Sequence, residues 1–499
     1  MNMTFKKQSV VAFIGFLMLN SSVFAQTIDA WVTKSDRSAL LEKQTEEISF
    51  SYKKGRPNPI VIDDRQFYQE MDGFGYSLTG GSAELLMQMS AAKRSEILKE
   101  LFTSGAGGGA GISYIRLTIG ASDLNSFVFS YDDLKDGDTD LKLKKFNLAQ
   151  DMNDVVPVMK EILAINPEIP IMASPWSAPA WMKTNNNIRG GSLKEEYHSV
   201  HAQYFVKYIQ EMAKHGINIG AITVQNEPLN ERNTPSMQWQ RSQMADFIKN
   251  HLGPAFTASG ITTKIMLFDH NTDRIDYPLA LMSDPEVDQY VDGSAFHNYR
   301  GDISSMSDLH RARPDKNLYF TEQMVVERWD DGILNITAPV TRLLIGATRN
   351  WSRNVILWNL AADPNDDPHT DNGGCPFCQG ALTIDGDQVI KNLAYYTIVH
   401  ASRFVPIGSR RVMSTGVGES VVSLTQDEEN GSIHRATVIA DAHVMPNVAF
   451  ITPQEEIVLI VANDTFSSKS FQIQYNGQYA EIKLEPGAVG TYRWKASKK

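Results

Sequence analysis

Two glutamates in the 499-residue chain each follow a short apolar run, and together they could do acid–base chemistry. Glu227 lies in the motif Asn226-Glu227-Pro228, and Glu322 ends the run Leu318–Glu322. Cleavage of a glycosidic bond needs such a pair, because one carboxyl protonates the leaving oxygen while the other attacks the anomeric carbon or activates water. A single glutamate after an apolar run is more often a solvated loop residue, so the hypothesis depends on the fold bringing the two together.

Eight apolar, β-rich runs alternate with amphipathic helical stretches and would position the two glutamates. The predicted strands are Met71–Gly75, Ser113–Thr118, Ile169–Ser174, Ile219–Val224, Thr263–Phe268, Asp292–His297, Leu318–Glu322 and Val355–Asn359. The helical stretches include Ala83–Phe102, Asp151–Ile165, His201–His215, Gln238–Leu252 and Thr337–Trp351. Continuously apolar strands separated by helices predict a buried parallel sheet, and eight such units predict an α/β fold of the (β/α)8 TIM-barrel type. Glu227 and Glu322 then follow strands four and seven, at the end of the barrel where catalytic residues lie.

The pattern changes after residue 404, which predicts an appended all-β sandwich domain. Short strands there alternate with Asn-Asp, Asn-Gly and Pro-Gly turns and have no helices between them. The early run Ile48–Tyr52 also reads as a strand. We therefore expect residues 69–404 to form the barrel, residues 405–499 to form the sandwich, and residues 26–68 to contribute to that sandwich.

Residues 1–25 have the pattern of a cleavable signal peptide. Lys6 and Lys7 precede the apolar stretch Val10–Leu19, and Ser-Val-Phe-Ala ends at Ala25. The apolar stretch is too short to cross the roughly 30 Å hydrocarbon core of a bilayer, and no later segment reads as a membrane span. We expect cleavage after Ala25 and a protein that is secreted or periplasmic.

The composition is that of a globular protein with a net charge of −11, which argues against disorder. No basic run offers a surface for phosphates, so we expect no nucleic-acid partner. An acidic chain with 9% aromatic residues suits an uncharged carbohydrate better than a polyanion. We expect a monomer.

The chain has two cysteines, Cys375 and Cys378, in a segment rich in Gly, Asp and Asn. A single CxxC pair in an exported chain favours a structural disulfide, with free thiols or a redox site as alternatives. Acidic residues and a histidine precede the pair: Asp363, Asp366, Asp367, His369 and Asp371. Their spacing matches no metal-binding motif, so we expect a polar loop at the cleft and no metal.

Several motifs, in order along the chain, resemble those of a known enzyme family. They are Asp72-Gly73-Phe74-Gly75, Tyr114-Ile115-Arg116, Ala173-Ser174-Pro175-Trp176-Ser177-Ala178-Pro179, Asn226-Glu227-Pro228, Phe320-Thr321-Glu322, Leu357-Trp358-Asn359 and Phe404-Val405-Pro406-Ile407-Gly408-Ser409. The chain resembles glycoside hydrolase family 30, in the branch that contains lysosomal glucosylceramidase and endo-β-1,6-glucanases. Asn-Glu-Pro alone occurs in many barrel glycosidases, whereas the Ser-Pro-Trp-Ser-Ala-Pro segment with the other matches is far more specific.

The resemblance implies a retaining double displacement without a cofactor, with Glu227 as acid/base and Glu322 as nucleophile. An acid/base must begin protonated, so the pKa of Glu227 is expected above its ordinary value and that of Glu322 below it. The resemblance further implies that the sugar is bound by Arg116, Asp123, Trp176, Asn226, Tyr299 and Trp358. We add His297, which ends the sixth predicted strand, although a lone histidine is more often structural.

The residue types agree with several of these implied roles and leave alternatives open. Arg116 could lower the pKa of a nucleophilic carboxylate or form an ion pair at the barrel rim. Trp176 and Trp358 could pack against a sugar ring or belong to the core. Asp123 could bind sugar hydroxyls or cap a loop. Asp269 and His270, after the fifth strand, are weaker candidates for the cleft.

The segment around Cys375 and Cys378 resembles loops of the β-1,6-glucanase branch more than the corresponding loop of the lysosomal enzyme. We therefore predict an endo-β-1,6-glucanase, with a glucosylceramidase-like β-glucosidase or a β-xylosidase as alternatives. A carbohydrate-binding protein without activity would have lost one of the glutamates, and both are present. A secreted disulfide oxidoreductase is disfavoured because no thioredoxin-like βαβ unit follows the cysteines.

Overall fold

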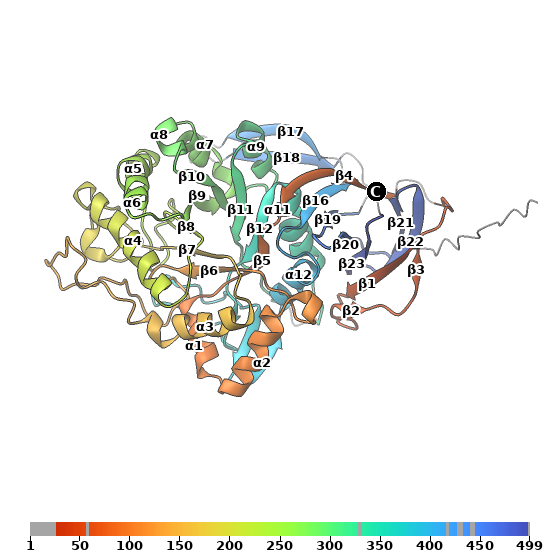
Figure 1. The fold of residues 1–499 in the computed structure, drawn as a ribbon, viewed down its shortest axis with the longest axis horizontal. Coiled ribbons are helices and arrows are strands. Elements are labelled where there is room, and N and C mark those ends of the chain that lie inside the picture. The colour runs from red at the N-terminus through yellow and green to blue at the C-terminus, as the bar shows by residue number, and fades with distance from the viewer. Residues whose placement is uncertain are drawn as a thin grey trace, which may run out of the picture.

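The computed structural model describes residues 26–55, 59–327, 332–415, 419–426, 433–439 and 445–497. The signal peptide expected at residues 1–25 lies outside the described residues. Figure 1 shows a barrel ringed by helices beside a β-sandwich that contains both ends of the described chain. Within the described ranges, no helix is long and apolar enough to cross a membrane.

Eight parallel strands close into a barrel, which confirms the predicted fold class. In chain order they are β5 (Gly73–Ser77), β6 (Tyr114–Thr118), β7 (Ile171–Ser174), β8 (Ala221–Thr223), β9 (Lys264–Asn271), β10 (Val291–His297), β11 (Asn317–Glu322) and β12 (Ser352–Leu357). Each overlaps a strand predicted from its apolar run. One buried cluster draws side chains from seven of the strands, among them Tyr114, Met266 and Tyr319, so the interior is a packed core.

Helices follow the barrel strands and cover the outside of the barrel. They are α1 (Gly80–Gln88), α2 (Ala91–Phe102), α3 (Val155–Ile165), α4 (His198–Lys214), α5 (Arg241–Phe247), α6 (Gly253–Ala258), α7 (Asp276–Met282), α8 (Pro285–Asp288), α9 (Ser305–Ala312), α10 (Thr337–Pro339), α11 (Gly346–Arg349) and α12 (Leu393–Ser402). Two segments are π-helical: η5 (Ile248–Leu252) and η7 (Val340–Ile345). Short 3₁₀ turns are η1 (Gly105–Gly107), η2 (Asp151–Asn153), η3 (Ala180–Met182), η4 (Glu195–Tyr197) and η6 (Thr272–Arg274).

The single helical stretch expected over Ala83–Phe102 is two helices, α1 and α2. Met89 has extended backbone after α1, and the Ser90 side chain accepts a hydrogen bond from the Lys93 amide at the start of α2. A serine at this position stabilises a helix start by satisfying an amide that has no partner within the helix. The apolar periodicity continues across the break and therefore conceals it.

The sandwich is formed by one long curled sheet. Its strand order is β2-β1-β23-β20-β19-β16-β4-β21-β22, with β3 paired to β1. The N-terminal strands are β1 (Thr27–Thr33), β2 (Glu42–Lys43), β3 (Ile48–Ser49) and β4 (Ile60–Glu70). The C-terminal strands are β16 (Arg410–Ser414), β19 (Asn447–Ile451), β20 (Glu456–Ala462), β21 (Lys469–Tyr475), β22 (Gln478–Leu484) and β23 (Val489–Lys495). A bridge between Ser51 and Tyr479 links the two ends of the sheet.

The N-terminal contribution to this sheet is larger than the single strand expected at Ile48–Tyr52. β3 covers only two residues, whereas β1 pairs with β23, and β4 lies between β16 and β21. β4 carries the polar sequence Asp63-Asp64-Arg65 and alternates buried with partly exposed positions at its start, so it lacks the continuous apolar character used to find strands.

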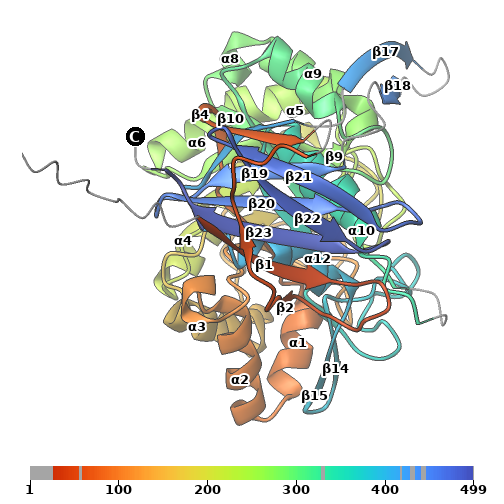
Figure 2. The ribbon, with the colours of Figure 1, turned by 90° about the vertical axis from the view of Figure 1, so that its right-hand side faces the viewer.

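Barrel and sandwich share a continuous apolar contact. Trp31 of β1 packs on Phe404 with ring centroids 4.5 Å apart, and both residues belong to the large core that includes the barrel. His400 of α12 is buried and hydrogen-bonds Thr33 and Thr491 of the sandwich at 2.9 and 2.8 Å. Figure 2 shows the sheet lying across one side of the barrel.

A small three-stranded sheet and a hairpin complete the described fold. β13 (Ala361–Ala362), β14 (Leu382–Asp385) and β15 (Gln388–Lys391) form a three-stranded sheet after the last barrel strand. The loop between β13 and β14 carries both cysteines. A second hairpin, β17 (Glu419–Gln426) and β18 (Ile433–Ile439), lies between β16 and β19 in the sequence.

Candidate active site

A pocket of about 640 Å³ opens at the end of the barrel where the parallel strands finish. The candidate residues that line it are Asp123, Glu227, His270, Tyr299, Glu322, Trp358, Cys375 and Cys378. Four other predicted residues are buried and do not line it: Arg116, Trp176, Asn226 and His297. The site therefore has a layer that faces the pocket and a layer beneath it.

Glu227 follows β8 with a backbone φ of +48°, a left-handed conformation that is uncommon for any residue except glycine. Its amide donates to the carbonyl of Asp269 at 3.0 Å, so the end of the neighbouring strand holds this conformation. The Glu227 carboxyl accepts a 2.6 Å hydrogen bond from the Asn230 side chain and lies 3.2 Å from Nδ1 of His297. Strained backbone of this kind is found at functional sites, where the surrounding structure fixes it.

Glu322 ends β11 and has different partners. Arg116 donates to its Oε2 at 2.6 Å, and the Tyr299 hydroxyl donates to its Oε1 at 3.0 Å. An oxygen of Glu322 and an oxygen of Glu227 lie within 4.8 Å of one another. The predicted pair of carboxyl groups is thus assembled from β8 and β11, on opposite sides of the barrel mouth.

Arg116 is fully buried at the centre of the lower layer. Besides Glu322 it donates to Asn226 at 2.8 Å and to Asp269 at 2.9 Å. Its guanidinium carbon lies 4.9 Å from the ring centre of Trp176. A planar donor with five N–H groups suits this arrangement, because it can bind several acceptors in fixed directions.

Asp269, which was only a weak candidate from its position after the fifth predicted strand, is the principal anchor of this layer. Its carboxyl accepts hydrogen bonds from Ser174, Thr223 and Thr321 at 2.9, 2.7 and 2.6 Å, in addition to Arg116. Burial opposes ionisation, but the charge of Arg116 and the contact with His297 hold the pKa of Asp269 well below its usual range. The residue is buried and does not line the pocket, so we correct the expectation that it faces the cleft.

His297 connects the two layers. Its Nε2 lies 3.1 Å from Asp269, and its Nδ1 lies 3.2 Å from Glu227 and 3.7 Å from Glu322. Burial disfavours a charged ring, yet Glu322 and the hydrogen bonds to Asp269 and Glu227 raise the pKa of His297 to about 9. Glu227, His297 and Glu322 are close enough together for a metal. However, the ring nitrogens of His297 lie at hydrogen-bond distance from Asp269 and Glu227, so the geometry fits a hydrogen-bonded network.

The two glutamates do not have the pKa order expected from the sequence. Burial alone would raise the pKa of Glu227, but His270, His297 and Asn230 bring it down to about 2. Burial and the negative charge of Glu227 raise the pKa of Glu322, against the opposing effects of His297 and Arg116. Two buried carboxyls this close repel when both are ionised, so the two glutamates share a proton and titrate as a unit.

Asp123 lies in the loop after β6 and lines the pocket while remaining 5% exposed. Burial and the charges of Glu322 and Glu227 raise its pKa to about 8. A neutral carboxyl can both donate and accept hydrogen bonds, which suits a sugar hydroxyl. The indoles of Trp176 and Trp358 stack at 5.2 Å, with Trp358 facing the pocket and Trp176 supporting it from below.

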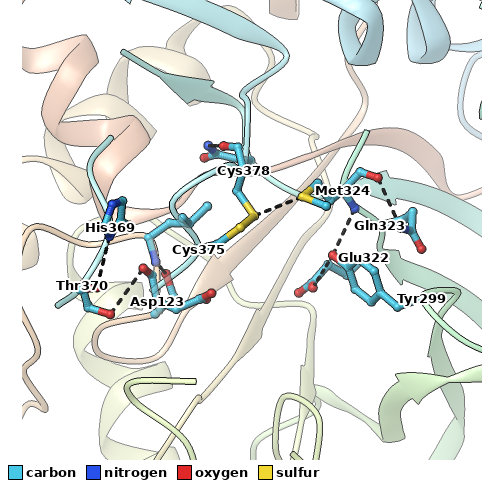
Figure 3. Close-up of a disulfide and its surroundings, with 12 residues drawn as sticks. Asp123, Tyr299, Glu322, Gln323, Met324, His369, Thr370, Cys375 and Cys378 are labelled. Atoms are coloured by element: carbon cyan, nitrogen blue, oxygen red, sulfur yellow. Dashed lines mark hydrogen bonds between the residues drawn. A yellow bond between two sulfur atoms is a disulfide. The ribbon is translucent and has the colours of Figure 1, made fainter. Parts of the chain in front are cut away.

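The loop after β12 places a disulfide at the pocket wall. Cys375 and Cys378 are bonded, and Sγ of Cys378 lies 3.3 Å from Sδ of Met324 (Figure 3). The Met324 amide donates to the Tyr299 hydroxyl at 3.0 Å, and that hydroxyl in turn donates to Glu322. On the other side of the disulfide, the Thr370 amide donates to the carbonyl of Asp123 at 2.9 Å. The loop therefore contacts segments that hold both Asp123 and Glu322.

Other pocket residues were not found by sequence reasoning. They lie on the loops after β8, β9, β10 and β12: Asn230, Asn233, Asp273, Arg274, Arg300 and Phe377. Loops have no periodicity that marks them, and only their nearness to a strand end could have indicated these positions. None of the residues of the acidic cluster before the cysteines lines the pocket. The Asp363 carboxylate instead accepts from the amides of Asn365 and Asp367, as in a turn.

An eight-stranded barrel whose pocket brings together two glutamates from strand ends is the arrangement of a glycoside hydrolase. The chain belongs to glycosyl hydrolase family 30: the family's TIM-barrel domain matches residues 71–405, and its beta sandwich domain matches residues 408–492. The family resemblance seen in the motifs is thereby confirmed.

Two relatives and one solved structure show how similar the chain is to characterised proteins. It is 36% identical over 386 residues to the endo-1,6-beta-D-glucanase BGN16.3 of Trichoderma harzianum, covering 72% of this chain and 76% of the relative. It is 26% identical to lysosomal acid glucosylceramidase of Mus musculus over 469 residues, covering 87% and 83%. The structure titled "The endo-beta1,6-glucanase BT3312" superposes with a TM-score of 0.81 at 31% identity, covering 94% of this chain and all of that one.

Proposed function

We propose that this glycoside hydrolase is a retaining endo-β-1,6-glucanase, exported after cleavage behind Ala25 and active as a monomer. Relatives and a solved structure named as endo-1,6-glucanases, at 31–36% identity, support the substrate. The observation that carries the mechanism is the closeness of Glu227 and Glu322, whose oxygens lie within 4.8 Å. Retaining enzymes separate their carboxyls by about 5–5.5 Å, whereas inverting enzymes need about 6.5–9.5 Å to admit a water molecule.

In the first step, Glu322 attacks the anomeric carbon and the glycosidic bond breaks. The leaving oxygen takes a proton from Glu227, so the products are a glycosyl ester on Glu322 and a shortened glucan. In the second step, Glu227 takes a proton from water as the water attacks the same carbon. The ester breaks, Glu322 is restored, and two inversions leave the configuration retained.

The shared proton must lie on Glu227 when substrate is bound, because Glu322 has to be ionised to attack and Glu227 has to protonate the leaving oxygen. An anomeric carbon next to Glu322 carries partial positive charge and stabilises that carboxyl in its ionised form. The leaving oxygen offers Glu227 an acceptor for a proton. Arg116 and Tyr299 are held against Glu322 and keep its carboxyl oriented toward the sugar.

The other predicted residues fit the binding of one glucosyl unit at the base of the pocket. Trp358 presents an aromatic surface backed by Trp176, and Asp123 offers a carboxyl to sugar hydroxyls. Asn226, bonded to Arg116, is placed beneath the pocket next to Glu227. A hydrogen bond from an asparagine to the sugar 2-hydroxyl strengthens in the transition state.

A glucosylceramidase-like β-glucosidase is the second candidate, supported by the mouse relative that covers 87% of this chain. A β-xylosidase is a third. The disulfide-bonded loop favours a glucan as substrate. The loop lines the pocket beside the reacting sugar, so its fixed shape can select the curved β-1,6 chain.

Product analysis tests the proposal. The mature enzyme should release oligosaccharides from β-1,6-glucan, with little action on β-1,3- or β-1,4-glucans, and NMR should show a β-anomer as the first product. An α-anomer would overturn the double displacement. Hydrolysis of glucosylceramide without hydrolysis of the glucan would overturn the substrate while leaving the mechanism intact. The Glu322→Gln variant serves as the inactive control.

A further inference from the structure

A second group of ligating side chains lies outside the pocket, on the helical face of the barrel. It consists of His198, the first residue of α4, with Asp246 of α5 and His251 of the π-helical turn η5. Nδ1 of His198 lies 3.1 Å from Oδ2 of Asp246, and Nε2 of His251 lies 3.6 Å from the same oxygen. We propose that these three side chains form a binding site for a divalent transition metal of the zinc type.

The spacing of the three ligand atoms supports this assignment. One ligand atom from each residue lies within 4.8 Å of the other two. Zinc binds histidine nitrogen and carboxylate oxygen at about 2.0–2.2 Å in a tetrahedron, which places neighbouring ligand atoms roughly 3.3 Å apart. The observed 3.1 and 3.6 Å bracket that value. Three protein ligands leave a fourth position for water, and Asp246 is about half exposed, so an ion can reach it from solvent.

Two of the three ligands, His251 and Asp246, are oriented by a second set of hydrogen bonds. Nδ1 of His251 lies 2.9 Å from the Ser199 hydroxyl, which leaves Nε2 directed at Asp246. The Asn250 side chain donates to Oδ1 of Asp246 at 2.7 Å and leaves Oδ2 toward the two histidines. Metal-binding histidines and carboxylates are typically held in this way through the atom that does not touch the ion.

The π-helical turn is what brings two of the ligands together. Asp246 and His251 are five residues apart, and in a regular α-helix side chains with this separation point about 140° apart. η5, from Ile248 to Leu252, widens the helix at this place. Its hydrogen bonds run between residues five apart, which moves such residues toward the same side, and π-turns of this kind occur frequently at functional sites.

The site would tie α4 to α5 and η5 close to the segment that carries Glu227. The His198 ring packs 5.9 Å from that of Trp239, and the Trp239 amide donates to the carbonyl of Pro228 at 2.9 Å. Pro228 follows Glu227 directly. An ion here joins two helices without touching the pocket, so we assign it a structural role. The proposal does not depend on the identity of the substrate.

The test uses the mature chain without a purification tag, stripped of metal by a chelator. Calorimetric titration with Zn²⁺ should show one site per chain, and Co²⁺ should give the strong visible absorption of a four-coordinate complex. Zn²⁺ should also raise the Tm. Asp246→Asn and His251→Asn should each weaken binding at least tenfold, and Ser199→Ala should weaken it by about tenfold. Circular dichroism and glucan hydrolysis verify that these variants are folded.

Two controls separate this site from other sources of binding. His215→Asn, at the C-cap position directly after α4, should leave the affinity unchanged. Glu322→Gln disrupts the carboxylate group in the pocket and should also leave it unchanged. The proposal is overturned if Zn²⁺ fails to bind the stripped chain, or if binding survives in the Asp246→Asn/His251→Asn double variant. Loss of binding in Glu322→Gln would place the ion in the pocket and would equally overturn it.

Discussion

At the scale of single residues, the two glutamates have partners that differ in kind. Glu322 is bound by the permanent cation Arg116 and by a tyrosine, whereas Glu227 contacts neutral Asn230 and the titratable His297. The assigned roles therefore lead to different consequences of substitution.

Glu322→Ala should abolish hydrolysis of every β-glucoside, because no covalent intermediate can form. Glu227→Ala should retain activity on glucosides whose leaving groups need no protonation, and azide should restore turnover by replacing water. NMR of the product should show a β-glucosyl azide. An α-glucosyl azide from Glu227→Ala would mean that the two roles are reversed.

Glu227→Gln should lower the pKa of Glu322, because the substitution removes the negative charge that raises it. Glu322 must be ionised to attack, so the acidic limb of the pH profile should move to lower pH for an aryl glucoside with a good leaving group. Rates of intermediate formation, measured against pH in wild type and variant, check this. An acidic limb that remains in place would show that another group controls it.

Asp123→Asn should stabilise the protein at alkaline pH while weakening sugar binding. The pKa of Asp123 rises from 3.8 to about 8 on folding, so between these values the folded protein holds a proton that the unfolded chain releases. The free energy of unfolding of the wild type therefore falls as pH rises through this window. The Asp123→Asn variant does not show this fall, because asparagine does not ionise. Urea unfolding should show a gain of about 1–3 kcal/mol at pH 8 and little at pH 4.

The control for this experiment is Asp136→Asn, which replaces an exposed aspartate and should not change the free energy of unfolding at either pH. An equal effect of Asp123→Asn at both pH values would show that the aspartate is not held protonated by the folded structure.

At the scale of elements, the loop between β13 and β14 joins two parts of the site. The Thr370 amide in this loop donates a hydrogen bond to the Asp123 carbonyl, and Sγ of Cys378 in the disulfide contacts Sδ of Met324. The sequence predicted a polar loop at the cleft and a structural disulfide, but the contact of the disulfide with the strand that carries the nucleophile depends on Met324, which no motif marks.

Replacing Cys375 and Cys378 by serine should reduce kcat/KM for β-1,6-glucan by more than that for a small aryl glucoside. The disulfide limits the freedom of a loop that a polymer must contact, whereas an aryl glucoside occupies mainly the base of the pocket. The kinetics of both substrates should be compared with and without a dithiol reductant, which should reproduce the effect in wild type only. Equal losses on both substrates would indicate that the loop serves folding alone.

At the scale of the whole molecule, the sandwich is a structural part of the enzyme. β1 and β4 come from before the barrel and lie inside the sheet, so the sandwich can close only when both ends of the chain meet. His400 in α12 hydrogen-bonds both Thr33, from the N-terminal part of the chain, and Thr491, from the C-terminal part.

His400→Ala should lower the free energy of unfolding by about 2–4 kcal/mol, since it removes the imidazole's hydrogen bonds to two buried threonine hydroxyls and opens a cavity. Burial lowers the pKa of His400 to about 3, so between pH 6.5 and 3 the unfolded chain binds a proton that the folded protein excludes. This residue's contribution is therefore lost as pH falls through that window. Unfolding followed by tryptophan fluorescence should show a smaller acid sensitivity in the variant; an unchanged midpoint would contradict the proposed bridge.

The sequence by itself determined the barrel, its eight strands and the two glutamates, because apolar runs and the residues that follow them are local features. It also indicated Arg116, Trp176, Asn226 and Trp358 through contiguous motifs. Local patterns did not reveal the strand β4, because its sequence is polar. They also did not reveal that the helical stretch Ala83–Phe102 is interrupted at Ser90.

Only the tertiary structure decided which residues face the pocket and which lie beneath it. Asp269 became the anchor of the site, and the pKa order of the glutamates was reversed. The π-helical turn that brings Asp246 to His251 was also invisible in the sequence. These properties arise from contacts such as that between Arg116 and Glu322, 206 residues apart, and burial and charge act through space between groups that the chain order does not place together.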